Sequence, residues 1–136
     1  IFIFTVVCYI NSNGQTNPAD SSQCNFLSSL KFKNGKAQIE VIAMVNEVGK
    51  ISDRETLKKL ESKGILKSKD FGYALVFHPI GCEKTYYISC RDSGKQALSL
   101  FKLGGEETKV KLSCIVFENY KLWDYPYFIV DKVKLQ

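Results

Sequence analysis

The sequence predicts a mainly β fold with one or two short helices, built as a single domain. Period-two alternation of apolar and polar residues recurs through the second half of the chain. By contrast, clear helix signals are confined to one segment near residues 53–63. The 136 residues are 45% hydrophobic and 24% charged, which is typical of one globular domain with its own core.

The first predicted strand lies around residues 39–45. Ile39, Val41 and Val45 fall on one face of an extended chain. Because Ile42 and Met44 make the other face partly apolar, we expect this strand to be buried on much of both faces.

A short helix is predicted over Asp53 to Lys63. Ser52 and Glu55 have the spacing of a capping box, in which each side chain bonds the other residue's backbone amide. Gly64 is suited to the left-handed position that ends a helix, where Ile65 can contact the last turn.

The remaining pattern predicts four more strands and a second helical segment. Residues 73–78 and 85–91 form a predicted hairpin around the turn at His78 to Gly81. Residues 97–103 form a short helix, or alternatively a strand, before Gly104 and Gly105. Two long strands follow at 109–118 and 127–135, and a change of phase near Asp131 in the second predicts a β-bulge.

The order of the predicted elements resembles that of a known fold. Three strands, a short helix, "GGEETKVKLSCIVFENY" and "YPYFIVDKVKL" resemble the closing half of an OB-fold barrel over about residues 71–135. The resemblance implies an OB-like five-stranded barrel. The helix at 53–63 departs from the simplest OB plan, so an α+β roll, with a helix packed on an antiparallel sheet as in cystatin-like folds, is the alternative.

The start of the chain has the features of a secretory signal. Ile1 to Ile10 is an uncharged apolar run too short to span a bilayer, and Ser12 and Gly14 are small residues before a cleavage point at Gln15. We expect residues 1–14 to be a signal peptide with a truncated start, residues 15–35 a polar and partly disordered segment, and residues 36–136 a single β-rich globular domain. A buried first strand is the alternative for the apolar run.

Cys8 raises the question of lipid anchoring. Thr5, Val6 and Val7 are not the small residues expected before a lipidated cysteine, so the sequence argues against a lipid anchor. The mature chain is therefore expected to be exported as a periplasmic, cell-surface or secreted protein without a transmembrane segment.

Four further cysteines predict two disulfide bonds. Cys90 and Cys114 share an inward strand phase, which favours a bridge between them and leaves Cys24 to pair with Cys82. A Cys82–Cys90 bridge is disfavoured because eight residues of extended chain span about 26 Å. Zinc bound by His78, Cys82, Cys90 and Cys114 is an alternative, but no closely spaced cysteine pair supports it.

Catalytic signals are sparse, and no cofactor is predicted. His78 is the only histidine, and no family signature supplies a nucleophile or an orienting carboxylate beside it. The segment Gly81 to Thr85 lacks the spacing of a phosphate-binding loop. Glu106 and Glu107 are adjacent and would point to opposite faces of a strand, so they are a poor acid–base pair.

The predicted ligand-binding site is an aromatic connection between the last two strands. Aromatic rings with polar tips on a loop offer stacking area to a ligand. The alternative is that Trp123 and Tyr127 plug the end of the barrel. The hairpin supplies secondary candidates at Tyr86, Tyr87 and Arg91. The predicted binding residues are Tyr120, Lys121, Trp123, Tyr125 and Tyr127.

These observations favour an exported, non-catalytic binding module whose partner is an exported or cell-surface protein or a glycan. An OB-type nucleic-acid binder is the second possibility, since aromatic stacking and basic charge are its usual chemistry. The net charge of +5 is spread among interspersed lysines and carboxylates, which argues against nucleic acid. An enzyme without a recognisable motif is the third possibility.

Overall fold

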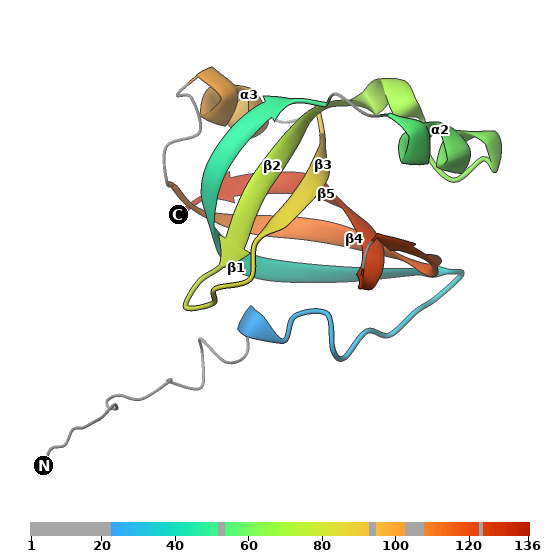
Figure 1. The fold of residues 1–136 in the computed structure, drawn as a ribbon, viewed down its shortest axis with the longest axis horizontal. Helices are drawn as coiled ribbons and strands as arrows, with labels where there is room; N and C mark the ends of the chain where they lie inside the picture. Colours follow the sequence, from blue (N-terminus) through green and yellow to red (C-terminus); the bar gives the residue numbers. More distant parts are fainter. Residues whose placement is uncertain (1–22, 52–53, 93–94, 103–107, 123) are drawn as a thin grey trace, which may run out of the picture.

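The protein is a closed five-stranded β-barrel, and the short helices α2 and α3 lie outside it (Figure 1). The computed structural model describes residues 23–51, 54–92, 95–102, 108–122 and 124–136. The predicted mainly β class and five-stranded barrel are confirmed, and the α+β roll is wrong. The elements are β1 (Lys36–Lys50), α2 (Glu55–Ser62), the 3₁₀ turn η2 (Ser68–Asp70), β2 (Phe71–Pro79), β3 (Tyr86–Arg91), α3 (Lys95–Lys102), β4 (Thr108–Leu122) and β5 (Tyr125–Leu135).

The strands close in the order β1-β2-β3-β5-β4, and all neighbours are antiparallel except β3 and β5. β1 makes closure possible because it is long enough to serve two partners. Its first part, Lys36 to Val45, pairs with β4, whereas Ala43 to Lys50 pairs with β2. A register shift between Val45 and Glu47 returns Val48 to the interior as the strand bends.

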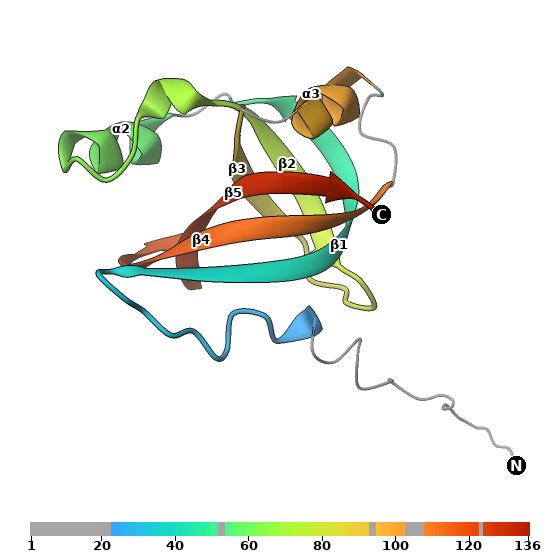
Figure 2. The same cartoon turned by 180° about the vertical axis from the view of Figure 1, so that it is seen from behind.

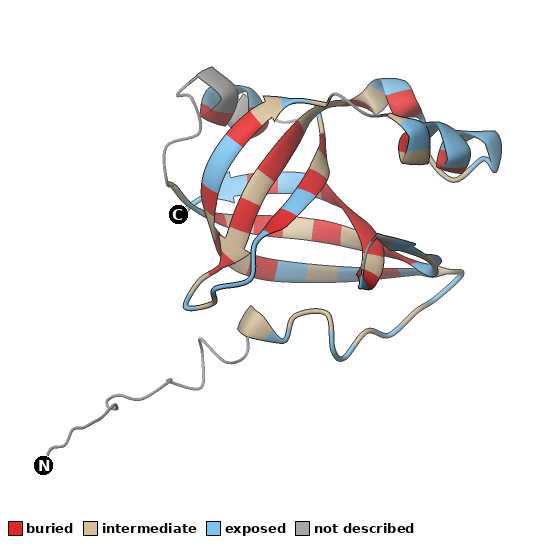
Figure 3. Ribbon diagram, in the orientation of Figure 1, coloured by how far each residue is buried: buried red, intermediate tan, exposed pale blue. Residues whose placement is uncertain are grey.

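Buried and exposed residues alternate along the strands (Figure 3). The buried residues are mainly apolar and form one cluster inside the barrel. The predicted burial of β1 on much of both faces is only partly correct, because Ile42 and Met44 are half-buried on its outer face. Burial of this apolar area at about 25 cal/mol per Å² is the main force that holds the barrel together. The largest fully buried side chains of this interior are Phe77, Phe128, Leu75, Ile88, Leu100 and Leu112.

The predicted bulge in the last strand is present at Asp131. Ser113 pairs with Lys132 and the next residue, Cys114, pairs with Val130, so Asp131 is the extra residue of β5. The bulge places the Asp131 carboxylate beside Arg91, whose Nε lies 2.6 Å from Asp131 Oδ1. The strand pattern thus predicted the bulge correctly, and the bulge supplies the carboxylate that pairs with Arg91.

α2 packs on the outside of the barrel and creates a second, smaller core. Leu57 and Leu60 are its buried residues, and they lie in a cluster with Phe117, Tyr127 and Ile129. The helix begins at Glu55, and Ser52, the predicted capping residue, lies outside the described residues.

The end of α2 is as predicted. Gly64 has a φ of +74°, and its amide donates to the carbonyl oxygen of Glu61 at 2.9 Å. The Ile65 amide donates to the Leu60 carbonyl oxygen at 3.0 Å, which completes a Schellman motif. In the part of the chain that the structure covers, no helix is both long and apolar enough to cross a membrane.

The segment before β1 packs along the barrel rather than extending away from it (Figure 1). Phe26, Leu30 and Phe32 lie against the interior cluster, so packing begins before the predicted domain boundary at residue 36. The structure thus makes residues 23–35 part of the folded unit.

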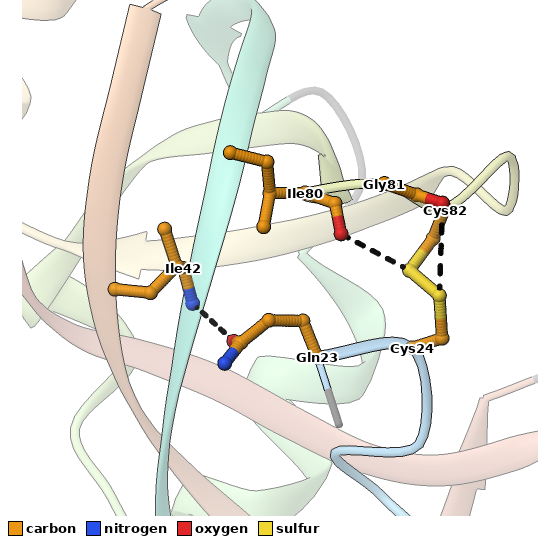
Figure 4. Close-up of a disulfide and its surroundings, with 6 residues drawn as sticks. All are labelled: Gln23, Cys24, Ile42, Ile80, Gly81 and Cys82. Carbon is orange, nitrogen blue, oxygen red and sulfur yellow. Dashed lines mark hydrogen bonds between the residues drawn. A yellow bond between two sulfur atoms is a disulfide. The ribbon is translucent and has the colours of Figure 1, made fainter. Parts of the chain in front are cut away.

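A disulfide and a hydrogen bond fix the beginning of this segment (Figure 4). Cys24 is bonded to Cys82 in the β2–β3 turn, with 5.6 Å between the Cα atoms. The pairing of β1 with β2 stops at Ala43, so the Ile42 amide instead donates to Gln23 Oε1 at 2.7 Å. The predicted Cys24–Cys82 bridge is therefore present, and it ties the segment to the open edge of β1.

The predicted Cys90–Cys114 bridge is not formed. Both cysteines are free and buried, as their inward phase predicts. However, β5 lies between β3 and β4, and Val130 pairs with Cys90 on one side and with Cys114 on the other. Two strand spacings separate their Cα atoms by about 9 Å, which exceeds the reach of a disulfide.

Candidate functional site

The predicted aromatic site is divided between the two cores. Tyr125 is 5% exposed inside the barrel, with its ring centroid 4.9 Å from that of Tyr86. Tyr127 is 3% exposed in the outer core, where it stacks on Phe117 at 6.0 Å and shares a side-chain hydrogen bond with Ser89. The burial of Tyr127 agrees with the alternative that its ring packs the fold, although its partners belong to the outer core and not to the barrel interior.

The other predicted residues of this connection are more accessible. Tyr120 is half-buried, and the Lys63 ammonium lies 5.5 Å from the centre of its ring. Lys121 is exposed, and Trp123 lies outside the described residues. Burial raises the pKa of Tyr125 to about 12, with Tyr86 and Asp124 adding to the effect, as expected for a phenol held in the core.

The secondary candidates on β3 have three different environments. Tyr86 is buried, whereas Tyr87 is 43% exposed on the outer face. Arg91 is held between Asp131 and Asp70 and lies over the Phe71 ring at 4.9 Å. Because its guanidinium is already paired with two carboxylates, Arg91 links η2 to β3 and β5.

His78 lies beside an amide and not a carboxylate. Its Nδ1 is 2.9 Å from Asn46 Oδ1, across the β1–β2 pair. Cys82 cannot be a ligand of the alternative zinc site, because its sulfur is bonded to Cys24. Among the residues described, no three His, Cys, Asp or Glu side chains gather as metal ligands, and Glu106 and Glu107 lie outside that set.

A groove is lined by residues of the N-terminal segment and of β1, β4 and β5. Figure 2 shows the ribbon of that segment running beside β1, with β4 and β5 next to it. Three hollows compose the groove, and neighbouring hollows share residues: Gln38 and Ile115 join two of them, and Ile39 and Glu40 join the third. The central hollow has a volume of about 410 Å³, and the one at the β1 start about 520 Å³. We call this continuous surface the N-terminal groove.

The lining of the N-terminal groove becomes more basic along its length, from one carboxylate, Glu40, at the disulfide end to three lysines at the other end. The end nearest the disulfide is lined by Gln23, Asn25, Phe26, Ser28, Ser29, Ile39 and Glu40. The centre is lined by Gln38, Ile39, Glu40, Ser113, Cys114, Ile115, Asp131 and Lys132. The basic end is lined by Lys31, Lys33, Asn34, Lys36, Gln38 and Ile115.

The two carboxylates of the groove have cationic partners outside its lining. Glu40 Oε1 lies 3.8 Å from Lys111 Nζ, and Asp131 is bonded to Arg91. The lysines of the lining, in contrast, form no ion pair among the residues that the structure describes. The groove therefore presents a surplus of positive charge.

A tight turn at Asn34 and Gly35 shapes the basic end. Both residues have positive φ, 57° and 79°, and Lys33 and Lys36 exchange backbone hydrogen bonds of 2.8 and 3.2 Å across them. This is the geometry of a type I′ turn, for which Asn-Gly is the preferred sequence. The dipeptide is therefore a sequence signal for this corner, although the turn is not among those predicted from the sequence.

Packing places the lysines of this turn at the surface. Phe32 is half-buried against the barrel interior, so its neighbours Lys31 and Lys33 point outward. The Glu118 amide donates to the Gly35 carbonyl oxygen at 3.0 Å, which fixes the turn to β4. The basic end is thus built on a rigid support.

No family model, curated protein or solved structure matches the chain. The candidate site therefore rests on the geometry of the groove itself.

Proposed function

We propose that the protein is an exported, non-catalytic binding module that holds an extended glycan in the N-terminal groove. The continuity of the groove is the observation that carries the proposal, because three hollows with shared lining residues offer one path to a chain-like ligand. The barrel order, the parallel β3–β5 pair and a helix between β3 and β4 resemble an OB fold, which often binds oligosaccharides.

The surface favours a polar ligand over a protein partner. Large exposed apolar side chains in the described ranges are Tyr87, Leu98 and Leu135, which belong to β3, α3 and the end of β5. Three such side chains are too few to form an extended apolar patch of the kind that marks many protein interfaces. Amides, hydroxyls and lysines instead line the groove, and these groups match sugar hydroxyls and acidic substituents.

Two further observations support the proposed export and the proposed non-catalytic role. The Cys24–Cys82 disulfide fits an oxidising compartment, and with the apolar start of the chain it supports export. His78 is bonded to Asn46, which can orient the ring but cannot stabilise an imidazolium as a carboxylate does. That arrangement favours binding over acid–base catalysis.

The proposal is tested by blocking the groove. Gln38 is exposed on β1 and lines two of the hollows, so Gln38→Trp should fill their junction. Thr85→Trp, at an exposed position between β2 and β3, is the matched control. The two variants and the parent are applied to a panel of immobilised neutral and acidic oligosaccharides.

We expect the parent and Thr85→Trp to bind the same members of the panel and Gln38→Trp to lose them, while all three proteins melt at similar temperatures. Absence of binding to every oligosaccharide by the parent would overturn the proposal. Equal binding by Gln38→Trp would place the site elsewhere on the molecule.

A further inference from the structure

We infer that the ligand of the N-terminal groove is a sulfated glycan, with sulfate groups at the lysine end and uncharged sugar hydroxyls at the disulfide end. This inference rests on the proposed function and specifies its ligand. It is carried by the distribution of charge along the groove and by the chemistry of each end.

Lys33 and Lys36 form a pair of like charges at the lysine end. These residues face each other across the Asn34–Gly35 turn as a hydrogen-bonded pair, so their side chains leave the same side of the ribbon. Like charges directly opposite each other destabilise a strand pair. A bound anion between the two ammonium groups relieves this repulsion.

The carboxylates of the lining do not compete for these lysines. Lys31 lies on the same side as Lys33, and Lys132 adds a fourth cation to the groove lining. Glu40 and Asp131, the acidic side chains of the lining, are each within ion-pair distance of a cation that lies outside it. An anionic ligand therefore meets lysines whose charge is not already neutralised.

The disulfide end of the groove supplies uncharged hydrogen-bonding groups. Asn25 and Ser29 are exposed there, and Ser28 Oγ donates to the Asn25 carbonyl oxygen at 2.7 Å, which orders the backbone. Amide and hydroxyl groups donate and accept hydrogen bonds, as sugar hydroxyls do. A ligand with charged and uncharged groups along one chain matches both ends at once.

Nucleic acid fits the same groove less well. Single strands are bound by aromatic platforms on which the bases stack. Phe26 is the aromatic residue of the lining, and its ring is in edge contact with Tyr86 and Phe128 at 5.5 and 5.7 Å. Because that ring is committed to the core, the groove offers cations without a stacking surface, which favours a sulfated sugar.

The test removes the lysine charges and compares probes. Lys31→Gln, Lys33→Gln and Lys36→Gln are combined in one variant, and Lys58→Gln, Lys59→Gln and Lys69→Gln in a control with the same change of net charge. All six lysines are exposed, so both variants should melt near the parent. The probe is a heparin hexasaccharide at fixed ionic strength, measured by calorimetry.

We expect the affinity of the groove variant to fall about a hundredfold, since the loss of each exposed lysine–sulfate ion pair weakens binding roughly fivefold. The affinity of the control should change by less than about threefold. Equal reductions in the two variants would overturn the inference, because they would indicate attraction to net charge alone. A groove variant with arginine at the three positions should retain binding.

Two further probes separate the inference from the proposed function. If a desulfated, N-acetylated hexasaccharide binds the parent as tightly as the sulfated one, the sulfate inference is wrong and the glycan-binding function stands. If neither hexasaccharide binds the parent, the sulfate inference is wrong, and the panel of neutral and acidic oligosaccharides decides separately whether the glycan-binding function stands. Tighter binding of a single-stranded oligodeoxynucleotide than of the sulfated hexasaccharide would replace the glycan by nucleic acid.

Discussion

Cys24 and Cys82 are bonded across 58 positions of sequence, and this single link joins the N-terminal wall of the groove to the β2–β3 turn. The N-terminal segment, residues 23–35, is also held by the Gln23–Ile42 hydrogen bond, by the hydrogen bond from the Glu118 amide to Gly35, and by the packing of half-buried side chains such as Phe26. The disulfide therefore affects both the stability of the barrel and the shape of the groove.

Removal of this disulfide should cost about 4 kcal/mol of unfolding free energy, because a closed loop of this length restricts the unfolded chain. Urea unfolding of the parent with and without a reductant measures the loss. The variant Cys24→Ser/Cys82→Ser should match the reduced parent and should not respond to the reductant. A reductant effect in that variant would assign the loss to other thiol chemistry.

The buried thiols should make the fold sensitive to alkaline pH. Burial raises the pKa of Cys90 to about 12, with Asp92 and Asp131 adding to the effect and Arg91 opposing it, and burial also raises the pKa of Cys114. Unfolded cysteine loses its proton near about pH 8.5, so above that value the unfolded state binds fewer protons than the folded state. The stabilisation is complete below about pH 8.5 and is lost as the pH rises toward about 12.

At about pH 10 this difference amounts to roughly 2 kcal/mol for each thiol. Urea midpoints at about pH 7.5 and about pH 10 test it, with Cys90→Ala/Cys114→Ala as the comparison. We expect a smaller pH dependence in the double variant, the remainder coming from Tyr86, Tyr125 and Tyr127, whose pKa values are raised by burial. An unchanged pH dependence would contradict the assignment to the thiols.

Arg91→Ala should destabilise the protein by about 2 kcal/mol. The substitution removes a charge-assisted hydrogen bond and leaves the Asp131 side chain, which is 25% exposed, without its cation. Glu40→Ala is the control, because Glu40 is 62% exposed, lies 3.8 Å from Lys111, and such surface pairs contribute less than about 1 kcal/mol. Chemical denaturation of both variants compares the two losses, and similar losses would rule out a special role for Arg91.

Tyr127→Ala should cost about 3–5 kcal/mol, since its ring is buried against Phe117 in the outer core. Tyr87→Ala, at an exposed position of β3, should cost less than about 1 kcal/mol. Thermal and urea unfolding measure both. A small loss for Tyr127→Ala would mean that the ring is accessible in solution and would restore it as a ligand-binding candidate.

Local signals determined much of this fold. Gly64 predicted the end of α2 because a left-handed residue is a local requirement, and the phase change at Asp131 predicted the bulge because strand periodicity is local too. The β2–β3 hairpin followed from two alternating runs around a turn. The Asn34–Gly35 turn has a local signal as well, because Asn-Gly is the preferred sequence of a type I′ turn.

Tertiary structure alone decided which strands distant in the sequence became neighbours, and hence the site. Cys90 and Cys114 share an inward phase, but the intervening β5 keeps them apart, which periodicity cannot reveal because it reports the face of a strand and not its partner. Tyr125 and Tyr127 formed one predicted aromatic surface, whereas hairpin pairing and α2 direct them into different cores. The groove was equally hidden, because its lysines become one surface only when the disulfide holds the N-terminal segment beside β1.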